Sequence, residues 1–271
     1  MKKLLLILVL AVMWSSAVRA NDASDGLREH QKGNYAEALV LFKTALVNGN
    51  EFERVTAQTM IGNMYRLGEG VVKDHKEALR WCRKAADQGH PSAQKCLGFV
   101  YRNGYGDHKE ALKWFLLASG QGLADAEFEI GQYYYFGLGD GNPVDFKEAA
   151  KWFRLAAEQG LVKAQYNLGT MYKNGKGVIQ NYKKAVKWWG KAAGMGHAKS
   201  QDALGMSYAA GYGITRDSKL AYMWLILAAS NGYFSDSGMR DILAKHLTPV
   251  EVEKAQAMAI DCEEKLYRNC N

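Results

Sequence analysis

The feature that most constrains this chain is a unit of about 36 residues that occurs five times. Each copy starts at a small anchor residue, followed by glycine after five residues, tyrosine after eight and a Gly-x-Gly pair after eleven. The anchors are Ala57, Ala93, Ala126, Ala164 and Ser200. The second half of every copy contains Ala-x-x-Trp, a pair of small residues and a closing glycine. The copies vary in length after the Gly-x-Gly pair, which marks that stretch as a loop.

The spacing within one copy predicts a helical hairpin. The anchor and the residues four, five and eight positions later share one face of a helix with 3.6 residues per turn, and the Ala-x-x-Trp half has the same periodicity. Small residues let two helices approach, tyrosine and tryptophan fill the space between layers, and Gly-x-Gly supplies the positive φ at which the first helix ends. One hairpin cannot bury its apolar face alone, so we expect five to stack into an α-solenoid.

The unit that begins at Ala164 resembles the Sel-1-like repeat, a relative of the tetratricopeptide hairpin. The resemblance rests on Ala164-Gln165-Tyr166-Asn167-Leu168-Gly169-Thr170-Met171-Tyr172, on Gly175-Lys176-Gly177-Val178 and on Ala185-x-x-Trp188. It covers residues 55 to 232, with a half-unit at 35–49, and implies an all-α, right-handed α-solenoid whose first helices line the concave side. Two copies depart from the pattern, because the second loses three residues after Gly106 and the third has an insertion at Asp140-Gly141-Asn142-Pro143.

We expect four segments along the chain. They are a signal peptide at 1–20, an N-terminal cap and half-repeat at 21–54, five repeats at 55–235 and C-terminal capping helices at 236–271. Thr248-Pro249-Val250-Glu251 has the pattern of a capping box with proline at the first helical position, and predicts a polar-faced helix to about Leu266. A solenoid needs such an end to cover its last apolar face.

The first twenty residues have the pattern of a secretory signal peptide. A basic start, Met1-Lys2-Lys3, precedes an apolar run from Leu4 to Trp14 and small residues ending at Ala20, after which we expect cleavage. As a helix, eleven apolar residues span about 16 Å, too short for a bilayer core of roughly 30 Å. We therefore expect a soluble periplasmic or secreted protein without stable membrane insertion. The sequence leaves open the lumen of a eukaryotic secretory pathway.

The net charge does not indicate a nucleic-acid-binding protein. Of the formal charge of +7, three units come from Lys2, Lys3 and Arg19. The remaining 32 basic and 28 acidic residues contain no run of five or more like charges. Nucleic acid and anionic membranes are therefore not expected as partners.

The four cysteines predict disulfides in an oxidising compartment. Cys82 and Cys96 each lie seven residues from the turn glycine Gly89, which places them at the same height in an antiparallel helix pair. Two buried thiols are the other interpretation, because the equivalents of Cys82 in the other copies are apolar. Cys262 and Cys270 would lie about 12 Å apart along a continuous helix, so they pair only if the helix unwinds after Leu266. Four cysteines allow three connectivities, and cysteine-rich relatives link helices near the same turn with a shorter spacing.

No catalytic, metal or cofactor site can be assembled from the sequence. The Gly-x-Gly pairs recur at one phase and lack the further glycine of a phosphate-binding loop. The six histidines have no metal-ligand spacing, and His75 and His108, at equivalent loop positions, are expected to be solvated. Ser92-Ala93-Gln94-Lys95 matches the Ser-x-x-Lys of serine β-lactamases, but the companion motifs Ser-Asp-Asn and Lys-Thr-Gly are absent. We expect Ser92 to cap a helix instead.

A candidate binding stripe runs along the first helices, at two, six and nine residues after each anchor. Aromatic and basic residues concentrate in its middle, a composition typical of hot spots for a peptide or an acidic chain end. The candidate partner-binding residues are Arg66, Phe99, Arg102, Phe128, Gln132, Tyr135, Tyr166 and Lys173. The alternative is that Phe99, Phe128 and Tyr166 tuck into neighbouring hairpins as ordinary packing.

These features predict an exported, non-catalytic scaffold that binds a protein or peptide in the cell envelope or outside the cell. The alternative from another class is a β-lactamase-like or cell-wall-peptide hydrolase, which the resemblance keeps open because some cysteine-rich secreted relatives are linked to penicillin binding or β-lactam hydrolysis. A secreted factor that docks onto host proteins is a third interpretation. Partner identity, pathway and oligomeric state do not follow from a repeat fold.

Overall fold

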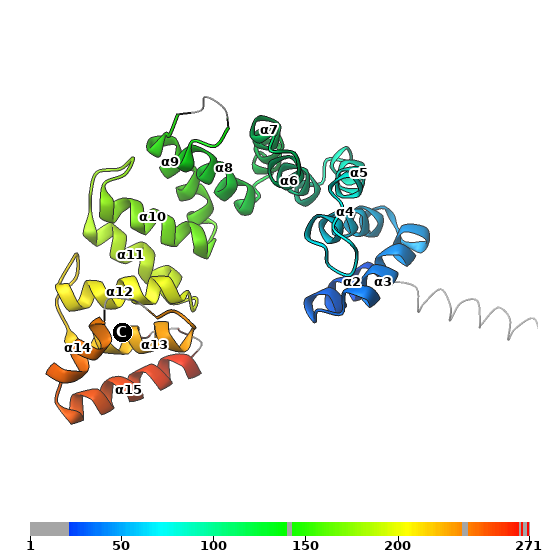
Figure 1. Ribbon diagram of the computed structural model, residues 1–271. Coiled ribbons are helices and arrows are strands. Elements are labelled where there is room, and N and C mark those ends of the chain that lie inside the picture. Colours follow the sequence, from blue (N-terminus) through cyan, green and yellow to red (C-terminus); the bar gives the residue numbers. More distant parts are fainter. Residues whose placement is uncertain (1–21, 140–142, 235–237, 266, 268–269, 271) are drawn as a thin grey trace, which may run out of the picture. The chain divides into compact units, whose positions relative to one another are not determined.

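The computed structural model describes residues 22–139, 143–234 and 238–265, together with Tyr267 and Cys270 (Figure 1). The predicted signal peptide and residues 140–142 of the predicted insertion lie outside the described residues. The described residues form helices and contain no β-strand, so the expected all-α repeat fold is confirmed. The chain divides into two compact units, residues 1–126 and 127–271.

The first unit is a series of helical hairpins. Its helices are α2 (Asp22–Gln31), α3 (Tyr35–Asn48), α4 (Glu51–Leu67), α5 (His75–Ala86), α6 (Pro91–Val100) and α7 (His108–Ser119). Helix α2 packs along α3, α4 along α5 and α6 along α7. The segment expected to hold a half-repeat therefore contains a whole hairpin, α2 and α3, in which Gly26 of the first helix lies against the ring of Phe42.

The second unit continues the same arrangement. Its helices are α8 (Ala124–Phe136), which begins at the boundary, α9 (Phe146–Glu158), α10 (Val162–Asn174), α11 (Tyr182–Ala193), α12 (Ala198–Ala210), α13 (Ser218–Ser230), α14 (Met239–His246) and α15 (Pro249–Glu264). Helix α10 packs on α9 and α11, and α12 on α11 and α13 (Figure 1). Each internal helix is thus covered on two sides, which is how a solenoid buries a continuous core.

The glycine five residues after each anchor lets the two helices of a hairpin interlock. In the fourth repeat, a Cβ atom at Gly169 would lie 2.6 Å from Cδ1 of Trp189, so a larger residue would displace that ring. The residue that follows the repeat tryptophan fills the same notch in the other repeats, in the pairs Gly62 and Cys82, Gly98 and Phe115, Gly131 and Phe153, and Gly205 and Leu225. The fully buried anchors add to this close approach.

Recurring polar caps and glycines set the ends of the helices. An aspartate or asparagine side chain accepts a backbone N–H at the start of each second helix, at Asp74, Asp107, Asp145, Asn181 and Asp217. The predicted positive φ is found in the fourth repeat, at 69° for Gly175 and 68° for Gly177. The closing glycines after the second helices are also in this region. The repeat pattern predicts the glycines, whereas the aspartate and asparagine caps are found only in the structure.

The second repeat ends its first helix differently. Gly104 lies within a π-helical turn, Tyr101–Tyr105, and the positive φ of 69° falls on Gly106 alone. The three-residue deletion brings Asp107, the cap of α7, directly after Gly106. The expectation that both glycines of every pair stop the helix is therefore wrong for this repeat, because the shortened loop leaves Gly104 inside the helix.

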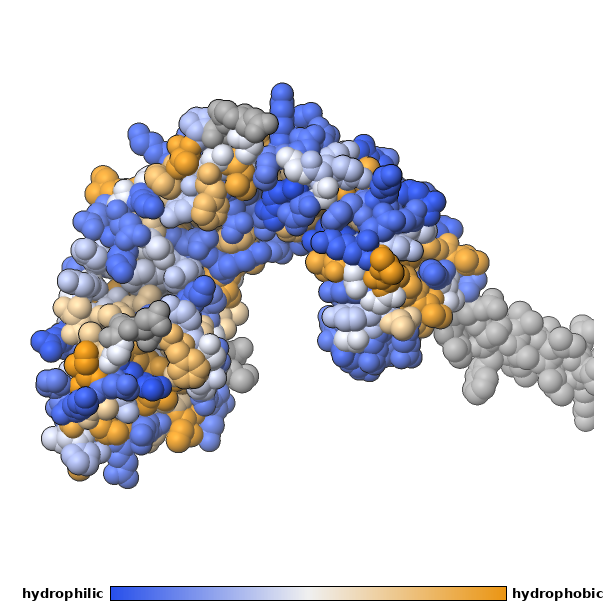
Figure 2. All heavy atoms as spheres, in the orientation of Figure 1, coloured by the Kyte–Doolittle hydropathy of each residue, from blue (hydrophilic) through white to orange (hydrophobic). Residues whose placement is uncertain are grey.

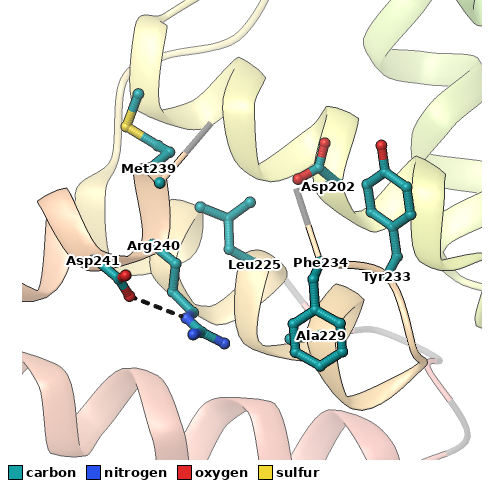
Figure 3. Close-up of a pocket in the computed structure, with 9 residues that line it drawn as sticks. Asp202, Leu225, Ala229, Tyr233, Phe234, Met239, Arg240 and Asp241 are labelled. Atoms are coloured by element: carbon teal, nitrogen blue, oxygen red, sulfur yellow. Dashed lines mark ion pairs between the residues drawn. The ribbon is translucent and has the colours of Figure 1, made fainter. Parts of the chain in front are cut away.

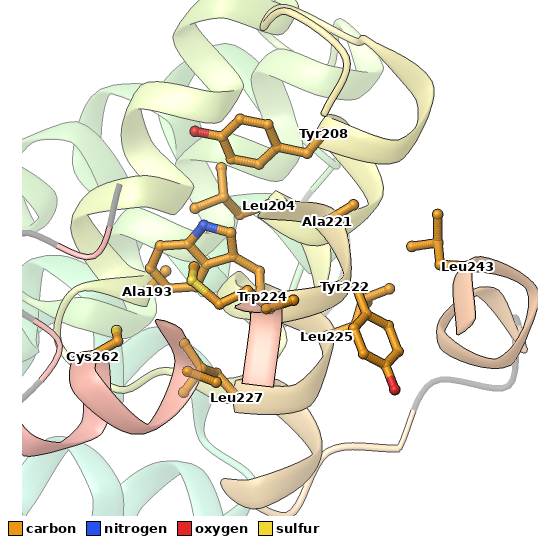
Figure 4. Packing of buried hydrophobic residues seen from close by; sticks show 13 residues of the cluster. Ala193, Leu204, Tyr208, Ala221, Tyr222, Trp224, Leu225, Leu227, Leu243 and Cys262 are labelled. Carbon is orange, nitrogen blue, oxygen red and sulfur yellow. The ribbon is translucent and has the colours of Figure 1, made fainter. Parts of the chain in front are cut away.

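The C-terminal helices close the second unit. Helix α15 begins with the predicted capping box, in which Glu251 N donates to Thr248 Oγ1 at 3.3 Å and Thr248 N donates to Glu251 Oε2 at 2.9 Å. Its Cys262 faces the same core as Trp224 and Leu227 of α13 (Figure 4). Helix α15 ends at Glu264, two residues before the predicted end at Leu266.

Two disulfides join elements within the units. Cys82 of α5 is bonded to Cys96 of α6, with Cα atoms 5.9 Å apart. Cys262 is bonded to Cys270, with Cα atoms 5.1 Å apart, and the early end of α15 lets the chain turn back for this bond. Tyr267, between them, has a φ of 61°.

The surface is mixed in character. In the part of the chain that the structure describes, no helix is long and apolar enough to cross a bilayer. Figure 2 shows polar residues over much of the visible face, with apolar residues scattered among them. Large exposed apolar side chains occur in both units, for example Val47 and Phe52 in the first and Phe136 and Ile179 in the second. Scattered exposed apolar residues are ordinary for folded proteins, so a binding site has to be argued from a concave surface.

Candidate binding groove

A cavity of about 310 Å³ lies between α10 and α12 of the second unit. Four side chains of α10 and six of α12 line it, joined by two from α11 and two from loops. They are Tyr166, Thr170, Lys173, Asn174, Tyr182, Trp189, Lys199, Asp202, Ala203, Met206, Ser207, Ala210, Tyr212 and Tyr233. The volume lies within the range of pockets that hold small ligands or side chains of a partner.

Helical periodicity brings these residues to one side of each helix. On α10 the lining residues follow at intervals of four, three and one, and on α12 intervals of three and one alternate, as expected for one side of a helix. The opposite faces of both helices are committed to the core, because Ala164 and Leu168 of α10 and Ser200 and Leu204 of α12 are buried. The repeat therefore leaves the same stripe of successive first helices available to form a groove.

Aromatic rings form much of the wall. Tyr182, at the start of α11, stacks on Tyr212 from the next repeat, with ring centroids 5.2 Å apart and an interplanar angle of 22°. Tyr212 is the middle residue of a Gly-x-Gly pair, and a Cβ atom on its neighbour Gly213 would collide with the backbone of Tyr182. The second glycine thus allows the loop of one repeat to pack against the second helix of the repeat before it.

Tyr166 and His197 form a half-buried pair beside the cavity. Their ring centroids are 5.1 Å apart, and the carbonyl of Tyr166 accepts hydrogen bonds from Thr170 Oγ1 at 3.0 Å and Trp189 Nε1 at 3.3 Å. Burial raises the pKa of the Tyr166 phenol. Burial and, less strongly, the charge of Lys199 lower the pKa of His197. Both rings are therefore neutral at pH 7, and Tyr166 retains its phenolic proton as a hydrogen-bond donor.

A second hollow, of about 370 Å³, adjoins the first. Gln132, Tyr135 and Phe136 of α8 and Asn167 and Thr170 of α10 line it. Thr170 belongs to both linings, so the two hollows adjoin at this residue, one between α8 and α10 and the other between α10 and α12. We call the residues that line these two hollows the first-helix groove.

Lys176 borders the second hollow through its contacts with Tyr135. Its Nζ atom donates to the hydroxyl of Tyr135 at 3.4 Å and lies 5.4 Å from the centre of that ring. Lys176 also lies 4.9 Å from the ring centre of Phe146. An ammonium group over aromatic faces is attracted by the ring but keeps its full charge.

A smaller cavity of about 60 Å³ lies on the other side of one wall. Asp202 and Tyr233 line both this cavity and the first-helix groove, and Leu225 and Phe234 line the small cavity (Figure 3). Arg240 and Asp241 form an ion pair at 3.6 Å at its edge. Its size limits it to one or two water molecules.

Four of the eight candidate residues lie in the groove. Tyr166 and Lys173 line the first hollow, and Gln132 and Tyr135 line the second. The groove also contains residues that sequence analysis did not single out as candidates, among them Tyr182, Lys199 and Tyr212. Tyr212 could have been found from the sequence, because it is the variable residue between two glycines that recur in every repeat. The glycine pattern by itself, however, predicts only a turn at this loop.

Phe128 is not part of an exposed stripe. Only 5% of its surface is accessible, its ring packs 5.4 Å from that of Phe153, and Lys163 lies 4.4 Å above it. The prediction of an exposed Phe128 is wrong because this position of the third repeat faces the second helix of its own hairpin. For Phe128, the alternative of ordinary packing is the correct one.

The remaining three candidates belong to the first unit. The half-buried ring of Phe99 lies between the guanidinium groups of Arg66 and Arg102, each 4.9 Å from the ring centre. Its other neighbour is Phe115, at 5.4 Å in an edge-on arrangement. These contacts form a cluster of cations and rings on α4, α6, the π-helical turn at Tyr101–Tyr105 and α7, all within the first unit.

The motif that suggested a hydrolase does not form a nucleophile and base. Ser92 is the second residue of α6, and the N-cap is His90, so the expectation that Ser92 caps the helix is wrong. Pro91 at the first helical position moves the cap two residues earlier. Among the described residues, no hydrogen bond joins Ser92 to Lys95, whose Nζ atom lies 3.5 Å from the carboxylate of Asp125.

The histidines also differ from expectation. His75 and His108 are half-buried at the first position of α5 and α7, and the Nδ1 atom of each is enclosed without a hydrogen-bond partner. They are therefore packing residues and not solvated ones. Among the described residues, no group of three His, Cys, Asp or Glu side chains is arranged to hold a metal ion.

Comparison with known proteins identifies the repeat. The model of the Sel1 repeat matches residues 55–90, 91–123, 124–161, 162–197 and 198–233. A search among curated proteins gives no match. A Sel1 repeat protein from Oxalobacter formigenes has a similar structure, with a TM-score of 0.69 and 34% identity, over 89% of this chain and 99% of that one.

Two further structures are similar. A protective antigen of uropathogenic Escherichia coli with an SLR fold has a TM-score of 0.69 and 31% identity over 87% of this chain, which spans half the length of that antigen. An immunity protein from Pseudomonas aeruginosa, with a TM-score of 0.54 and 21% identity, covers 78% of this chain and 86% of its own and shares the fold. Since the repeat model matches most of its length, the chain belongs to the Sel1 repeat family.

Proposed function

We propose that this protein is an exported Sel1 repeat scaffold that binds a segment of a protein partner in the first-helix groove. The observation that carries the proposal is that two neighbouring hollows, lined by residues of α8, α10 and α12, adjoin at Thr170. Adjoining hollows can accept successive side chains of an extended segment, and aromatic walls provide contact area at a small entropic cost. No catalytic step is part of the proposal.

Export is supported by the sequence and by the cysteines. The first twenty residues have the pattern of a cleavable signal peptide. The described residues contain no free cysteine, and disulfides persist in oxidising compartments. N-terminal sequencing of protein purified from the envelope fraction should begin at Asn21.

A groove-filling substitution tests the binding site. Thr170→Trp places an indole where both hollows meet, and Leu117→Trp adds the same group at an exposed position of α7 in the other unit. Tagged wild type and both variants are used to capture partners from the native envelope fraction, after circular dichroism has shown equal helicity. We expect wild type and Leu117→Trp to capture the same protein and Thr170→Trp to lose it.

Equal capture by all three proteins would refute the groove as the site. If Thr170→Trp unfolds, Ala210→Trp takes its place, because Ala210 lines the first hollow at an exposed position. The hydrolase alternative has its own test: turnover of nitrocefin by the purified protein that disappears in Ser92→Ala would refute the non-catalytic scaffold.

A further inference from the structure

Basic residues are concentrated in one repeat of the second unit. Between Glu158 and Asp202 the sequence contains eight lysines and no aspartate or glutamate. They are Lys163, Lys173, Lys176, Lys183, Lys184, Lys187, Lys191 and Lys199. This stretch includes the whole of α10 and α11. The lysines are interspersed with apolar and aromatic residues; seven of them lie in the fourth repeat, and Lys199 lies at the start of the fifth.

Several of these lysines lie over aromatic rings. Lys176 lies over Tyr135 and Phe146, Lys184 lies 5.3 Å from the ring centre of Tyr172, and Lys191 lies 4.5 Å from that of Trp188. Contact with a ring holds the lysine stem in place without cancelling its charge. Lys176, Lys184 and Lys191 therefore contribute positive charge to this repeat.

Two of the lysines stand in the wall of the first-helix groove. Lys173 projects from α10 and Lys199 from α12, both exposed, on the two helices that enclose the first hollow. Within the described residues, neither Nζ atom has a carboxylate within ion-pair distance. Of the described residues that line this hollow, Asp202 alone is acidic, and Lys176 adds a third ammonium group beside the second hollow.

From this arrangement we infer that the partner segment in the groove is an acidic peptide that also carries aromatic or aliphatic side chains. The inference rests on the proposed function, because it names the chemistry of the segment bound at the same site. Carboxylates of the peptide meet Lys173, Lys199 and Lys176. Its apolar side chains enter the hollow beside Met206 and the stacked rings of Tyr182 and Tyr212.

Selection from random peptides tests this chemistry without knowledge of the natural partner. The probe is a displayed library of random peptides of about 12 residues, each of which spans roughly 40 Å when extended. The immobilised targets are the mature wild type, Thr170→Trp, the double variant Lys173→Gln/Lys199→Gln and the matched control Lys183→Gln/Lys187→Gln. Both double variants remove two positive charges from the second unit, and the control lysines do not line the groove.

We expect the selected peptides to be net acidic and to contain aromatic or aliphatic residues. Their affinity should fall about tenfold in Lys173→Gln/Lys199→Gln, change less than about twofold in the control, and weaken as salt is raised from about 0.05 to 0.5 M. They should not bind Thr170→Trp. A single-stranded oligothymidine of similar length serves as a polyanion without apolar side chains.

Three outcomes would overturn the inference, and they separate it from the proposed function. Neutral or basic peptides that bind wild type and not Thr170→Trp would leave the groove as the site and refute its acidic specificity. Oligothymidine binding as tight as that of the peptides would show a general polyanion site. Peptides that bind Thr170→Trp as well as wild type would refute the proposed function itself, and the inference with it.

Discussion

Replacing Met195 by glutamine should stabilise the fourth repeat. The residue seven positions after the repeat tryptophan is Gln88, Gln121, Gln159, Met195 or Asn231 in the five copies. Four of these donate a side-chain amide to the residue that follows the anchor of the same repeat, in the pairs Gln88 to Gln58 at 3.1 Å, Gln121 to Gln94 at 2.9 Å, Gln159 to Glu127 at 2.8 Å and Asn231 to Gln201 at 3.0 Å. The fourth repeat lacks the donor.

The missing donor leaves a buried acceptor unsatisfied. Gln165 is 5% exposed and its Nε2 atom donates to the carbonyl of Ala157 at 3.2 Å, but its Oε1 atom is enclosed without a partner. Met195 itself is 68% exposed, so it buries little apolar surface that the substitution would lose. Its backbone N–H donates to the carbonyl of Ala192 at 3.1 Å, and Gln121 makes the equivalent bond to Ala118 at 3.2 Å. Glutamine therefore fits the turn at position 195.

The magnitude follows from the cost of an unmade hydrogen bond. A buried polar atom without a partner costs about 1–3 kcal/mol, and ordering the new glutamine side chain returns part of this gain. We expect Met195→Gln to raise the free energy of unfolding by about 1 kcal/mol, which corresponds to a rise in Tm of about 2–4 °C for a unit of this size. Equilibrium urea unfolding and differential scanning calorimetry of the mature protein measure both quantities.

A double-mutant cycle separates the hydrogen bond from other effects. Met195→Leu is the matched control, because it has the same exposure and no amide, and we expect it to change Tm by less than about 1 °C. In a Gln165→Met background the acceptor is gone, so Met195→Gln should no longer stabilise the protein. Equal gains with and without the Gln165 acceptor, or no gain in either background, would refute the reasoning.

Three other predictions follow from the same repeat geometry. Burial raises the pKa of Glu127, so the folded state binds the proton more tightly than the unfolded state, and the stability contributed by this group is present at low pH and lost as pH rises through the folded pKa. Glu127→Gln, which supplies the residue found at this position in the other repeats, should therefore stabilise the protein at pH 7 in urea unfolding, with a gain that vanishes below about pH 4. A gain that is constant with pH would contradict this. Gly169→Ala should destabilise the protein by about 1–3 kcal/mol, because its Cβ atom would lie 2.6 Å from Trp189. Gly190→Ala, where a Cβ atom would have nothing within 4 Å, should stabilise the protein by about 0.5–1 kcal/mol in calorimetry. Similar effects of the two substitutions would be inconsistent with the interlocked helices. The mature protein should show no free thiol under denaturing conditions before reduction and four afterwards. Reduction should also lower its Tm, since the disulfide between Cys82 and Cys96 alone is expected to contribute about 3 kcal/mol to stability. Free thiols in the unreduced protein would rule out one or both bonds.

The helical hairpins could be predicted from the sequence because the same residue pattern occurs in five copies. Five copies of the same glycine and alanine spacing allow one interpretation, and the structure confirms the all-α fold. For the hairpin of α2 and α3, the sequence pattern predicts only the second helix. Helix α2 has a glycine that packs against the second helix, Gly26, but it lacks the Gly-x-Gly pair that follows the other first helices.

The groove was predictable in part. Tyr135, Tyr166 and Lys173 follow from helical periodicity on a single helix, and the structure places them in the groove lining. The stacking of Tyr212 on Tyr182 depends on the offset between neighbouring hairpins, which the period of one helix does not determine. The burial of Phe128 depends on its contact with Phe153 of the second helix of its hairpin, which the period of one helix does not show. Local spacing thus identifies a face of a helix, and packing decides which of its residues stay exposed.

The central claim is that the first-helix groove binds the partner, and site-specific photo-cross-linking tests it most directly. A benzophenone side chain replaces Ala210, which is exposed in the groove lining, or Leu117, which is exposed on α7 of the first unit. Each tagged protein is irradiated in the intact envelope fraction, and covalent products are identified by mass spectrometry. We expect a cross-linked partner from position 210 and none from position 117. The same partner cross-linked from both positions, or from position 117 alone, would contradict the account.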